Sequence, residues 1–304
     1  MNFPDSDKIK KLAKSLFHNS DRPTPPVKKE TDSSKEFELF GLDQSELEED
    51  LHGGPLIREN FSDGETRIFG KYTQEQVHML MEWSGIFQAL HDKGYSQTDV
   101  ELQYLSDQDQ RIFVREKDEV LIHIRLKLSS FHFRLHPGAP RKKLLYIDWL
   151  MTRHPHTKKL RRDRLFPGQD MPGLGIFGHI SDFITNMALG VGAKGAFNIP
   201  EYFHDAVLFH RQFRFYDPVR EAFFRALLRD LRKHGIREIS HALSENRVIS
   251  GHGDPVSWTP AEMISALDPE LEETLWRGEF FTKVVRELKR NSFKILEKPA
   301  GEKT

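Results

Sequence analysis

A glycine turn that leads into an apolar helix is the feature of this sequence best suited to chemistry. Gly173 and Gly175 lie in the stretch PGQDMPGLG, and the residues from Ile176 to Leu189 carry apolar side chains at helical spacing. The first backbone N–H groups of a helix have no partner within the helix, and glycine lets the backbone approach a bound group closely. The turn is therefore a candidate site for an anion such as a phosphate.

A single carboxylate in the preceding strand is the second candidate. The strand expected at 144–151 reads LLYIDWLM. Alternation divides its side chains between two faces, one with Leu145, Ile147 and Trp149 and the other with Tyr146, Asp148 and Leu150. An unpaired buried carboxylate is costly, so Asp148 needs a partner or a purpose. It is either paired with a neighbouring Arg or backbone amide, or it is a general base beside a substrate amine.

Basic residues crowd between this strand and the turn. Residues 152–166 contain six Lys and Arg residues together with His154 and His156. Such a run is usually a solvated loop, but because it leads into the turn, some of its charges could meet the phosphate groups of a ligand. No further side chain at metal-ligand spacing accompanies the two His residues, so we expect no metal site.

The periodicity of apolar residues predicts the elements that position these groups. They are a helix at 73–93 capped by Thr73 and Gln76, strands at 100–104, 111–115, 119–133 and 144–151, a helix at 176–189, a strand at 195–199, a helix at 201–212 and a strand at 213–215. In the strand at 119–133, apolar residues from Ile122 to Leu128 alternate with His123, Arg125 and Lys127. This alternation predicts one buried face and one solvated face.

The last third of the chain continues with further elements. They are a helix from Asp217 to Gly235, strands at 237–243 and 247–249, a hairpin turn at GHGD with His252 exposed, and a helix at 270–289. This region could cover the open side of the sheet, form a wall of the substrate site or make a homodimer contact.

The order of elements over residues 73–216 resembles that of the GNAT superfamily, the acetyl-coenzyme-A-dependent N-acyltransferases. The pyrophosphate-binding turn of that family reads Q/R-x-x-G-x-G/A, and DMPGLG at 170–175 matches its glycines, with Asp170 in place of the Gln or Arg. A later family signature, N-x-x-A-x-x-L-Y-x-x-x-G-F, is matched in part. The matching residues are Ala206, Leu208, Phe209 and Phe213.

The resemblance implies an α+β fold, in which helices flank a mixed, largely antiparallel sheet and a C-terminal α/β extension follows. It also implies that acetyl-CoA or another acyl-CoA is the cofactor and that an amine, in a small molecule or a protein, is the acceptor. The residues implied to bind the cofactor are Leu150 on the pantetheine, Gly173, Leu174, Gly175, Ile176, Phe177 and Gly178 at the pyrophosphate, and Asn198.

The resemblance also assigns proton-transfer roles. Asp148 would deprotonate the amine, directly or through water. Phe209 stands where the family has its proton-donating Tyr, which leaves His210 or Tyr202 to protonate the departing thiolate. The alternative is a catalytically silent protein of the same fold with a regulatory or protein-interaction role.

Composition divides the chain into five parts. They are a basic amphipathic tail helix at 1–18, a linker and surface-lying segment at 19–60, the acyltransferase-like domain at 61–216, a C-terminal extension packed on the same body at 217–296 and a disordered tail at 297–304. Residues 37–60 alternate short apolar pairs with acidic residues, and we expect them to lie across the domain surface.

The bulk composition excludes several classes of protein. The 304 residues include 45 Lys and Arg and 46 Asp and Glu, so no global charge attracts nucleic acid or an anionic membrane. Cysteine is absent, which excludes a disulfide framework, thiolate zinc sites and a cysteine nucleophile. The sequence has no apolar stretch of about 20 residues and no secretory signal. We therefore expect a cytoplasmic protein without a transmembrane segment or a nucleic-acid partner.

Overall fold

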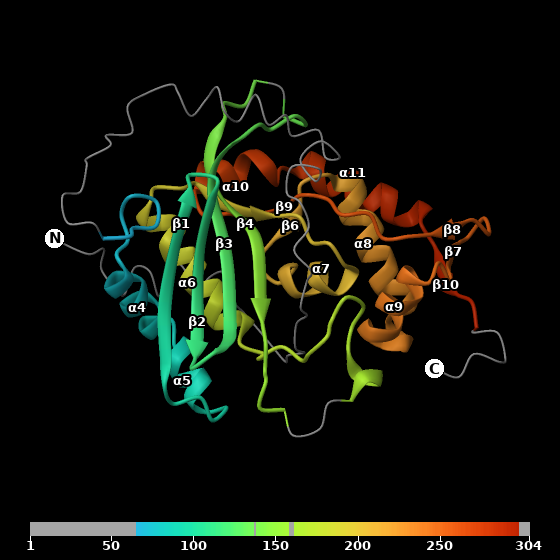
Figure 1. Cartoon of the computed structure of the whole chain (residues 1–304). Coiled ribbons are helices and arrows are strands. Elements are labelled where there is room, and N and C mark those ends of the chain that lie inside the picture. The colour runs from blue at the N-terminus through green and yellow to red at the C-terminus, as the bar shows by residue number, and fades with distance from the viewer. Residues whose placement is uncertain (1–64, 137, 158–160, 298–304) are drawn as a thin grey trace.

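Figure 1 shows the computed structural model of the chain, in which the structure describes residues 65–136, 138–157 and 161–297. The helices are α4 (Gln74–Trp83), α5 (Ile86–His91), η1 (Arg162–Arg164), α6 (Phe177–Gly190), α7 (Phe203–Phe209), α8 (Pro218–Leu231), η2 (Arg232–His234), α9 (Gly235–Ser244), α10 (Pro269–Leu275) and α11 (Gly278–Arg290). The strands are β1 (Thr98–Ser106), β2 (Asp109–Glu116), β3 (Glu119–Phe131), β4 (Lys142–Thr152), β5 (Gly195–Asn198), β6 (Arg214–Phe215), β7 (Val248–Ser250), β8 (Pro255–Val256), β9 (Met263–Ala266) and β10 (Phe293–Ile295). The tail helix expected at 1–18, the segment expected at 19–60 and all but the first residue of the expected tail at 297–304 lie outside the described residues.

Seven strands form one mixed, largely antiparallel sheet in the order β1-β2-β3-β4-β5-β9-β6, and a second sheet has the order β10-β7-β8. The strands β1 to β4 are antiparallel neighbours. By contrast, β4 and β5 are parallel and are connected through α6, as parallel neighbours require a crossover. Because helices flank this sheet (Figure 1), the predicted α+β fold is confirmed.

The parallel strands β4 and β5 are paired over a short distance. Their register joins Leu145 to Ala196 and Tyr146 to Phe197. β5 then ends, whereas β4 continues to Thr152 with β3 still paired to it on the other side. Among the described strands, none pairs with this last part of β4 on the side of β5.

β4 contains a β-bulge at Asp148. Arg125 of β3 lies opposite Trp149, and the next residue of β3, Leu126, lies opposite Ile147. Asp148 is therefore an extra residue in β4 that has no counterpart in β3.

The bulge makes the predicted faces of β4 wrong, because alternation beyond it is shifted by one residue. The sequence predicts that Trp149 shares a face with Leu145, but Trp149 packs in a separate cluster with Met151. Leu150, predicted on the opposite face, packs against the main core that contains Leu145.

The helices α4, α5 and α6 cover one face of the strands β1 to β4 (Figure 1) and bury the main core there. Ile122 and Ile124 of β3 belong to this core, as predicted. The other face of β3 is predicted to be solvated, and this prediction is wrong, because His123 and Lys127 are buried as well. Lys127 tolerates burial because it faces Asp148, and the ring of His123 packs by stacking on Phe113.

The first predicted helix is two helices, α4 and α5. Thr73 Oγ1 accepts from the Gln76 N–H at 3.2 Å and Gln76 Oε1 accepts from the Thr73 N–H at 3.1 Å, so the predicted capping box is confirmed. The helix is interrupted at Gly85, whose φ of 74° lies in the left-handed region. The ring of His179 in α6 lies 3.0 Å from the position of a Gly85 Cβ, so a side chain from another element occupies the break.

The strand predicted at 237–243 is wrong, because this segment belongs to α9. Ile239, Ala242 and Leu243 are buried there at helical spacing. A stretch of seven residues with few apolar side chains fits a strand or a helix, and the packing of α9 against α7 decides between them.

The helix predicted at 270–289 is also wrong in part, because α10 and α11 are separate. Trp276 interrupts them with φ and ψ of −108° and 44°. The predicted hairpin at GHGD is confirmed, since β7 and β8 are antiparallel and His252 is exposed.

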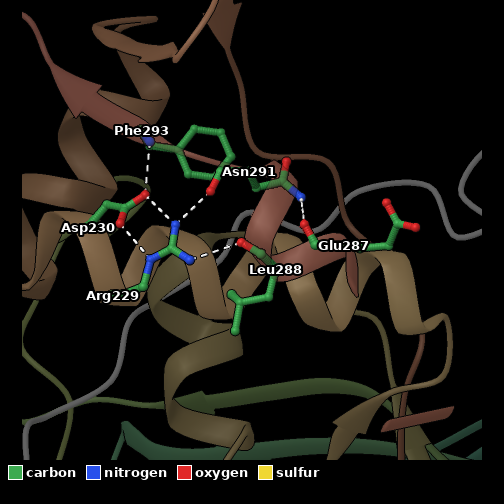
Figure 2. Close-up of polar contacts among 6 residues, drawn as sticks. All are labelled: Arg229, Asp230, Glu287, Leu288, Asn291 and Phe293. Carbon is green, nitrogen blue, oxygen red and sulfur yellow. Dashed lines mark hydrogen bonds and ion pairs between the residues drawn. The ribbon is translucent and has the colours of Figure 1, made fainter. Parts of the chain in front are cut away.

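Arg229 and Asp230 connect the end of α8 to α11 and β10 by hydrogen bonds (Figure 2). Arg229 donates to the carbonyl oxygens of Leu288 at 2.9 Å and Asn291 at 2.6 Å. Asp230 Oδ2 accepts from the Phe293 N–H at 2.9 Å. The arginine thereby satisfies carbonyl groups that the end of α11 leaves without helical partners.

The C-terminal region also completes the main core and the sheet. Phe224 and Leu227 of α8 and Leu243 of α9 belong to the same buried cluster as the residues of α6. The strand β9 comes from this region and lies between β5 and β6.

Candidate functional site

The glycine turn is fixed to the end of β4 by two hydrogen bonds. The His154 N–H donates to the Pro172 carbonyl oxygen at 2.9 Å, and the Leu174 N–H donates to Thr152 Oγ1 at 3.2 Å. Gly175 then adopts a φ of 66°, a conformation that glycine tolerates best. The turn is therefore fixed to β4, and α6 begins directly after it.

The helix α6 begins without a side-chain cap. Among the described residues, none accepts a hydrogen bond from the N–H groups of Phe177, Gly178 or His179. Gly178 is exposed, and nothing lies within 4 Å of the position of its Cβ. The other residues of the turn are buried, namely Gly173, Leu174, Ile176 and Phe177, while Gly175 is half-buried. An anion could therefore reach these N–H groups from the side of Gly178.

Asp170 is paired with Arg153 on the outside of the turn. Arg153 Nη2 lies 3.1 Å from Asp170 Oδ2. The Asp170 side chain is 62% exposed, so the pair contributes little to stability. It does balance a negative charge that would otherwise repel an anion at the turn.

Asn198 ends β5 at the point where β4 and β5 part. It is 3% exposed, and its Oδ1 has no hydrogen-bond donor among the described residues. A buried amide oxygen without a donor costs about 1–3 kcal/mol. Asn198 can therefore accept a hydrogen bond from a ligand that enters between the strands.

Asp148 is buried and lies between two cations of β3. Arg125 Nε contacts Oδ2, and Lys127 Nζ lies 3.5 Å from Oδ1. Neither oxygen receives an aligned hydrogen bond from the described residues, so the contacts are ion pairs. Burial lowers the pKa of Lys127, and the nearby carboxylate offsets this lowering in part. Of the two alternatives for Asp148, pairing with a neighbouring Arg is confirmed.

Tyr202 lies against the loop that precedes the turn. A Cβ on Gly168 would lie 2.7 Å from Tyr202 Oη, so the absence of a side chain at Gly168 permits the close approach. Burial, and next the negative charge of Glu201, raise the pKa of Tyr202 to about 12. Proton transfer from such a phenol to a thiolate, whose conjugate acid has a pKa of about 8.5, is unfavourable.

His210 points into the contact between α7 and α8. Its Nε2 donates to Glu221 Oε1 at 2.8 Å, and Glu221 also accepts from Arg225 Nε at 2.6 Å and from the Phe215 N–H at 3.1 Å. Burial raises the pKa of Glu221, but the hydrogen bonds and charges of His210 and Arg225 outweigh it and lower the pKa overall. His210 is thus the partner of a buried carboxylate.

The two His residues of the basic run are engaged by Tyr95. The Tyr95 hydroxyl lies 2.5 Å from His154 Nδ1, and the Tyr95 ring stacks on His156 with centroids 4.6 Å apart. Arg161, which is exposed, pairs with Asp163 at 2.7 Å. In the described ranges, no group of three or more His, Cys, Asp or Glu side chains could hold a metal ion.

The predicted site residues fall into two sets. The turn, Leu150 and Asn198 belong to the carboxyl ends of β4 and β5 and the start of α6, and Tyr202 contacts the loop before the turn at Gly168. Asp148 and His210 instead contact other elements. Asp148 contacts Arg125 of β3, and His210 contacts Glu221 of α8.

The sequence analysis missed three partners of these side chains. Arg125 and Lys127 of β3 are recognisable as polar residues of one face, but their position beside Asp148 depends on the register of β3 and β4 and on the bulge. Glu221 carries no local signal, because its helix is joined to His210 by a turn and a short strand.

The membrane-spanning potential of the helices and the comparisons with known proteins complete the description of the chain. In the part of the chain that the structure describes, no helix combines the length and apolar character needed to cross a membrane. No protein-family model matches this chain, and no curated protein matches its sequence.

Proposed function

We propose that this chain is an acyl-CoA-dependent N-acyltransferase that passes an acyl group directly from a thioester to an amine. The observation that carries the proposal is the short pairing of β4 with β5, beyond which β4 continues alone on that side. These parallel neighbours are joined by the glycine turn and α6, yet they are paired only at Leu145 and Tyr146. Ligands of sheets with parallel strands bind beyond the carboxyl ends of the strands, where the connections open. The GNAT superfamily, which the sequence resembles, holds acyl-CoA between two neighbouring parallel strands that part in this way.

Each part of the cofactor has a partner of suitable chemistry at this opening. The N–H groups of Phe177, Gly178 and His179 would receive the pyrophosphate, where the helix dipole also favours negative charge. The unpaired edge of β4 near Leu150 would pair with the amides of pantetheine. Asn198 Oδ1 would accept from an amide N–H of the same arm.

In the transfer step, the amine nitrogen attacks the thioester carbon, an N–C bond forms and the C–S bond breaks. The amine loses one proton, and the departing thiolate can accept one. We keep Asp148 as the proposed base, acting through water, with Tyr202 or His210 as proposed donors to the thiolate.

A protein that binds acyl-CoA without transferring the acyl group is the second candidate. The observation that favours it is that the groups proposed to transfer protons have other partners or an unsuitable pKa. Asp148 faces two cations, His210 is bonded to Glu221, and burial raises the pKa of Tyr202 to about 12.

Cofactor binding is tested by calorimetric titration of the full chain with acetyl-CoA, using Gly178→Asp and Gly278→Asp. Both glycines lie in the first turn of a helix with open space at the Cβ position, so the two substitutions are matched. At Gly178 the new carboxylate would meet the pyrophosphate, and repulsion of about 1–4 kcal/mol should weaken binding at least about fivefold. Gly278→Asp should bind as the unaltered chain does.

Two outcomes contradict the proposal of a cofactor site at α6. One is the absence of binding to the unaltered chain at millimolar acetyl-CoA, and the other is equal binding by both variants. Thiol release with a panel of amines then separates the two candidates, since binding without amine-dependent release supports the silent protein.

A further inference from the structure

The face of β1 to β4 that lies away from α4, α5 and α6 combines cations with aromatic rings. We call it the basic-aromatic face, and it is lined by Arg111, Phe113, His123, Arg125, Lys127 and Trp149. It also carries two carboxylates, since Asp109 pairs with Arg111 and Asp148 pairs with Arg125 and Lys127. The rings of Phe113 and His123 stack at 4.3 Å, and the His123 and Trp149 rings are 6.1 Å apart. The three rings therefore form a row across β2, β3 and β4.

This face is more deeply buried than the described elements around it explain. Phe113 is 8% exposed, Trp149 5% and Lys127 5%. The helices α4 to α6 lie on the opposite face (Figure 1), and among the described residues outside the sheet, Met171 packs against Trp149. A sheet face in contact with water leaves such side chains partly accessible. The burial thus requires a further cover.

Two buried polar atoms on this face also lack partners in the described part of the chain. They are the indole Nε1 of Trp149 and Nε2 of His123. An indole N–H can only donate, so the cover should supply an acceptor such as a carboxylate or a carbonyl oxygen. The row of rings requires that the same cover supply apolar side chains.

Residues 36–51 of this chain have the required composition. The segment reads EFELFGLDQSELEEDL and contains seven Asp and Glu residues, no Lys, Arg or His, and six Phe and Leu residues. No other stretch of this length in the printed sequence is free of basic residues and as acidic. Arg125 and Lys127 share the single carboxylate of Asp148, so this part of the face has an excess of one positive charge, and the acidic segment is complementary to it.

The segment can also reach the face. Glu65, the first described residue, lines a hollow between α4 and β1, the edge strand of the sheet, so the segment would have to pass around this edge to reach the other face. The distance from β1 to β4 across the sheet is about 15 Å at the usual strand spacing. The linking residues 52–64 can span about 40 Å when extended.

We propose that residues 36–51 dock on the basic-aromatic face of their own chain. The carboxylates meet the cations and the Trp149 N–H, and the Phe and Leu side chains lie over the row of rings. This cover is a contact between segments far apart in the sequence, and it does not depend on the proposed cofactor site.

The absence of cysteine permits a direct test with introduced pairs. Ser45→Cys is combined with Glu101→Cys, whose backbone lies opposite Phe113 on the same face, or with Glu82→Cys, which is exposed on α4. Both partners are Glu to Cys changes in the full chain. Because Glu101 is half-buried and pairs with Arg115 while Glu82 is exposed, each rate is divided by the rate at which the same thiol reacts with a small disulfide. Under oxidation, the pair with Glu101→Cys should cross-link within one chain at least tenfold faster than the pair with Glu82→Cys.

Charge reversal then tests the basis of the contact. Glu46→Lys, Glu48→Lys and Glu49→Lys together should abolish the preference for Glu101→Cys. Equal rates for the two pairs, or a preference that survives charge reversal, would overturn the proposal. Cross-links that join two chains would assign the face to the segment of a second copy and would overturn it as well.

Discussion

Two buried carboxylates of this protein, Asp148 in the sheet and Glu221 in α8, are stabilised in different ways. Glu221 accepts hydrogen bonds from Arg225, His210 and the Phe215 N–H, all within 3.1 Å. Asp148 faces two cations without an aligned hydrogen bond from the described residues. Directed hydrogen bonds fix a geometry, whereas a charge contact tolerates movement. Glu221 therefore holds the neighbouring elements in a fixed geometry, whereas the side chain of Asp148 can more easily change its contacts.

This difference bears on the two candidate functions. A carboxylate held by charge alone can exchange one partner for another at small cost, so Asp148 could turn toward an amine if Arg125 moved. His210 is bound into the Glu221 network and could act as a proton donor only by breaking it. Of Asp148 and His210, Asp148 is thus the better candidate for the proposed proton transfer.

The largest expected effect is that of Glu221→Gln. The amide NH₂ would face a donor in place of an acceptor, so the free energy of unfolding should fall by about 4 kcal/mol. Urea denaturation followed by circular dichroism measures it. The control is Glu270→Gln, because Glu270 is 75% exposed in its pair with Lys142 and should change stability by less than about 0.5 kcal/mol. Similar losses in the free energy of unfolding for both variants would contradict a structural role of Glu221 between the helices.

Asp148→Asn should have a smaller effect, because no aligned hydrogen bond is lost. We expect a loss of about 2 kcal/mol, since the substitution removes the negative charge that faces two cations. The same denaturation experiment measures it against Asp163→Asn, which breaks an exposed pair. A loss equal to that of Glu221→Gln would show that directed bonds do not distinguish the two carboxylates.

The smallest expected effect is on the pH dependence of stability. The folded pKa of Glu221 lies below its ordinary value of 4.5, so folding releases protons from this group. Its contribution is complete above that value and is lost as the pH falls through the folded pKa. Between pH 5 and pH 3, Glu221→Gln should lose stability less steeply than the unaltered chain, by up to about 1.4 kcal/mol per pH unit. Parallel curves would argue against a lowered pKa.

The sequence predicts elements better than it predicts neighbours. The strands β1 to β4, the helix α6 and the Thr73 cap follow from local patterns and are confirmed. The bulge at Asp148 and the break at Gly85 depend on β3 and on His179, which are distant partners. Local periodicity carries no information about such contacts.

The candidate site divides in the same way. The turn from Gly173 to Gly178 is recognisable because its chemistry is that of consecutive backbone groups. The partners of Asp148 and His210 are set by strand register and helix packing, and a single sequence contains no signal for either.

The position of β9 between β5 and β6 has a consequence for synthesis on the ribosome. β5 is complete at Asn198, but its antiparallel neighbour begins at Met263. At about 5–20 residues per second, several seconds pass before that neighbour emerges. During this time one edge of β5 offers unpaired backbone groups to other chains. The nascent protein is therefore most vulnerable to misassociation before its last third is translated, even though most of its hydrophobic residues have already been made.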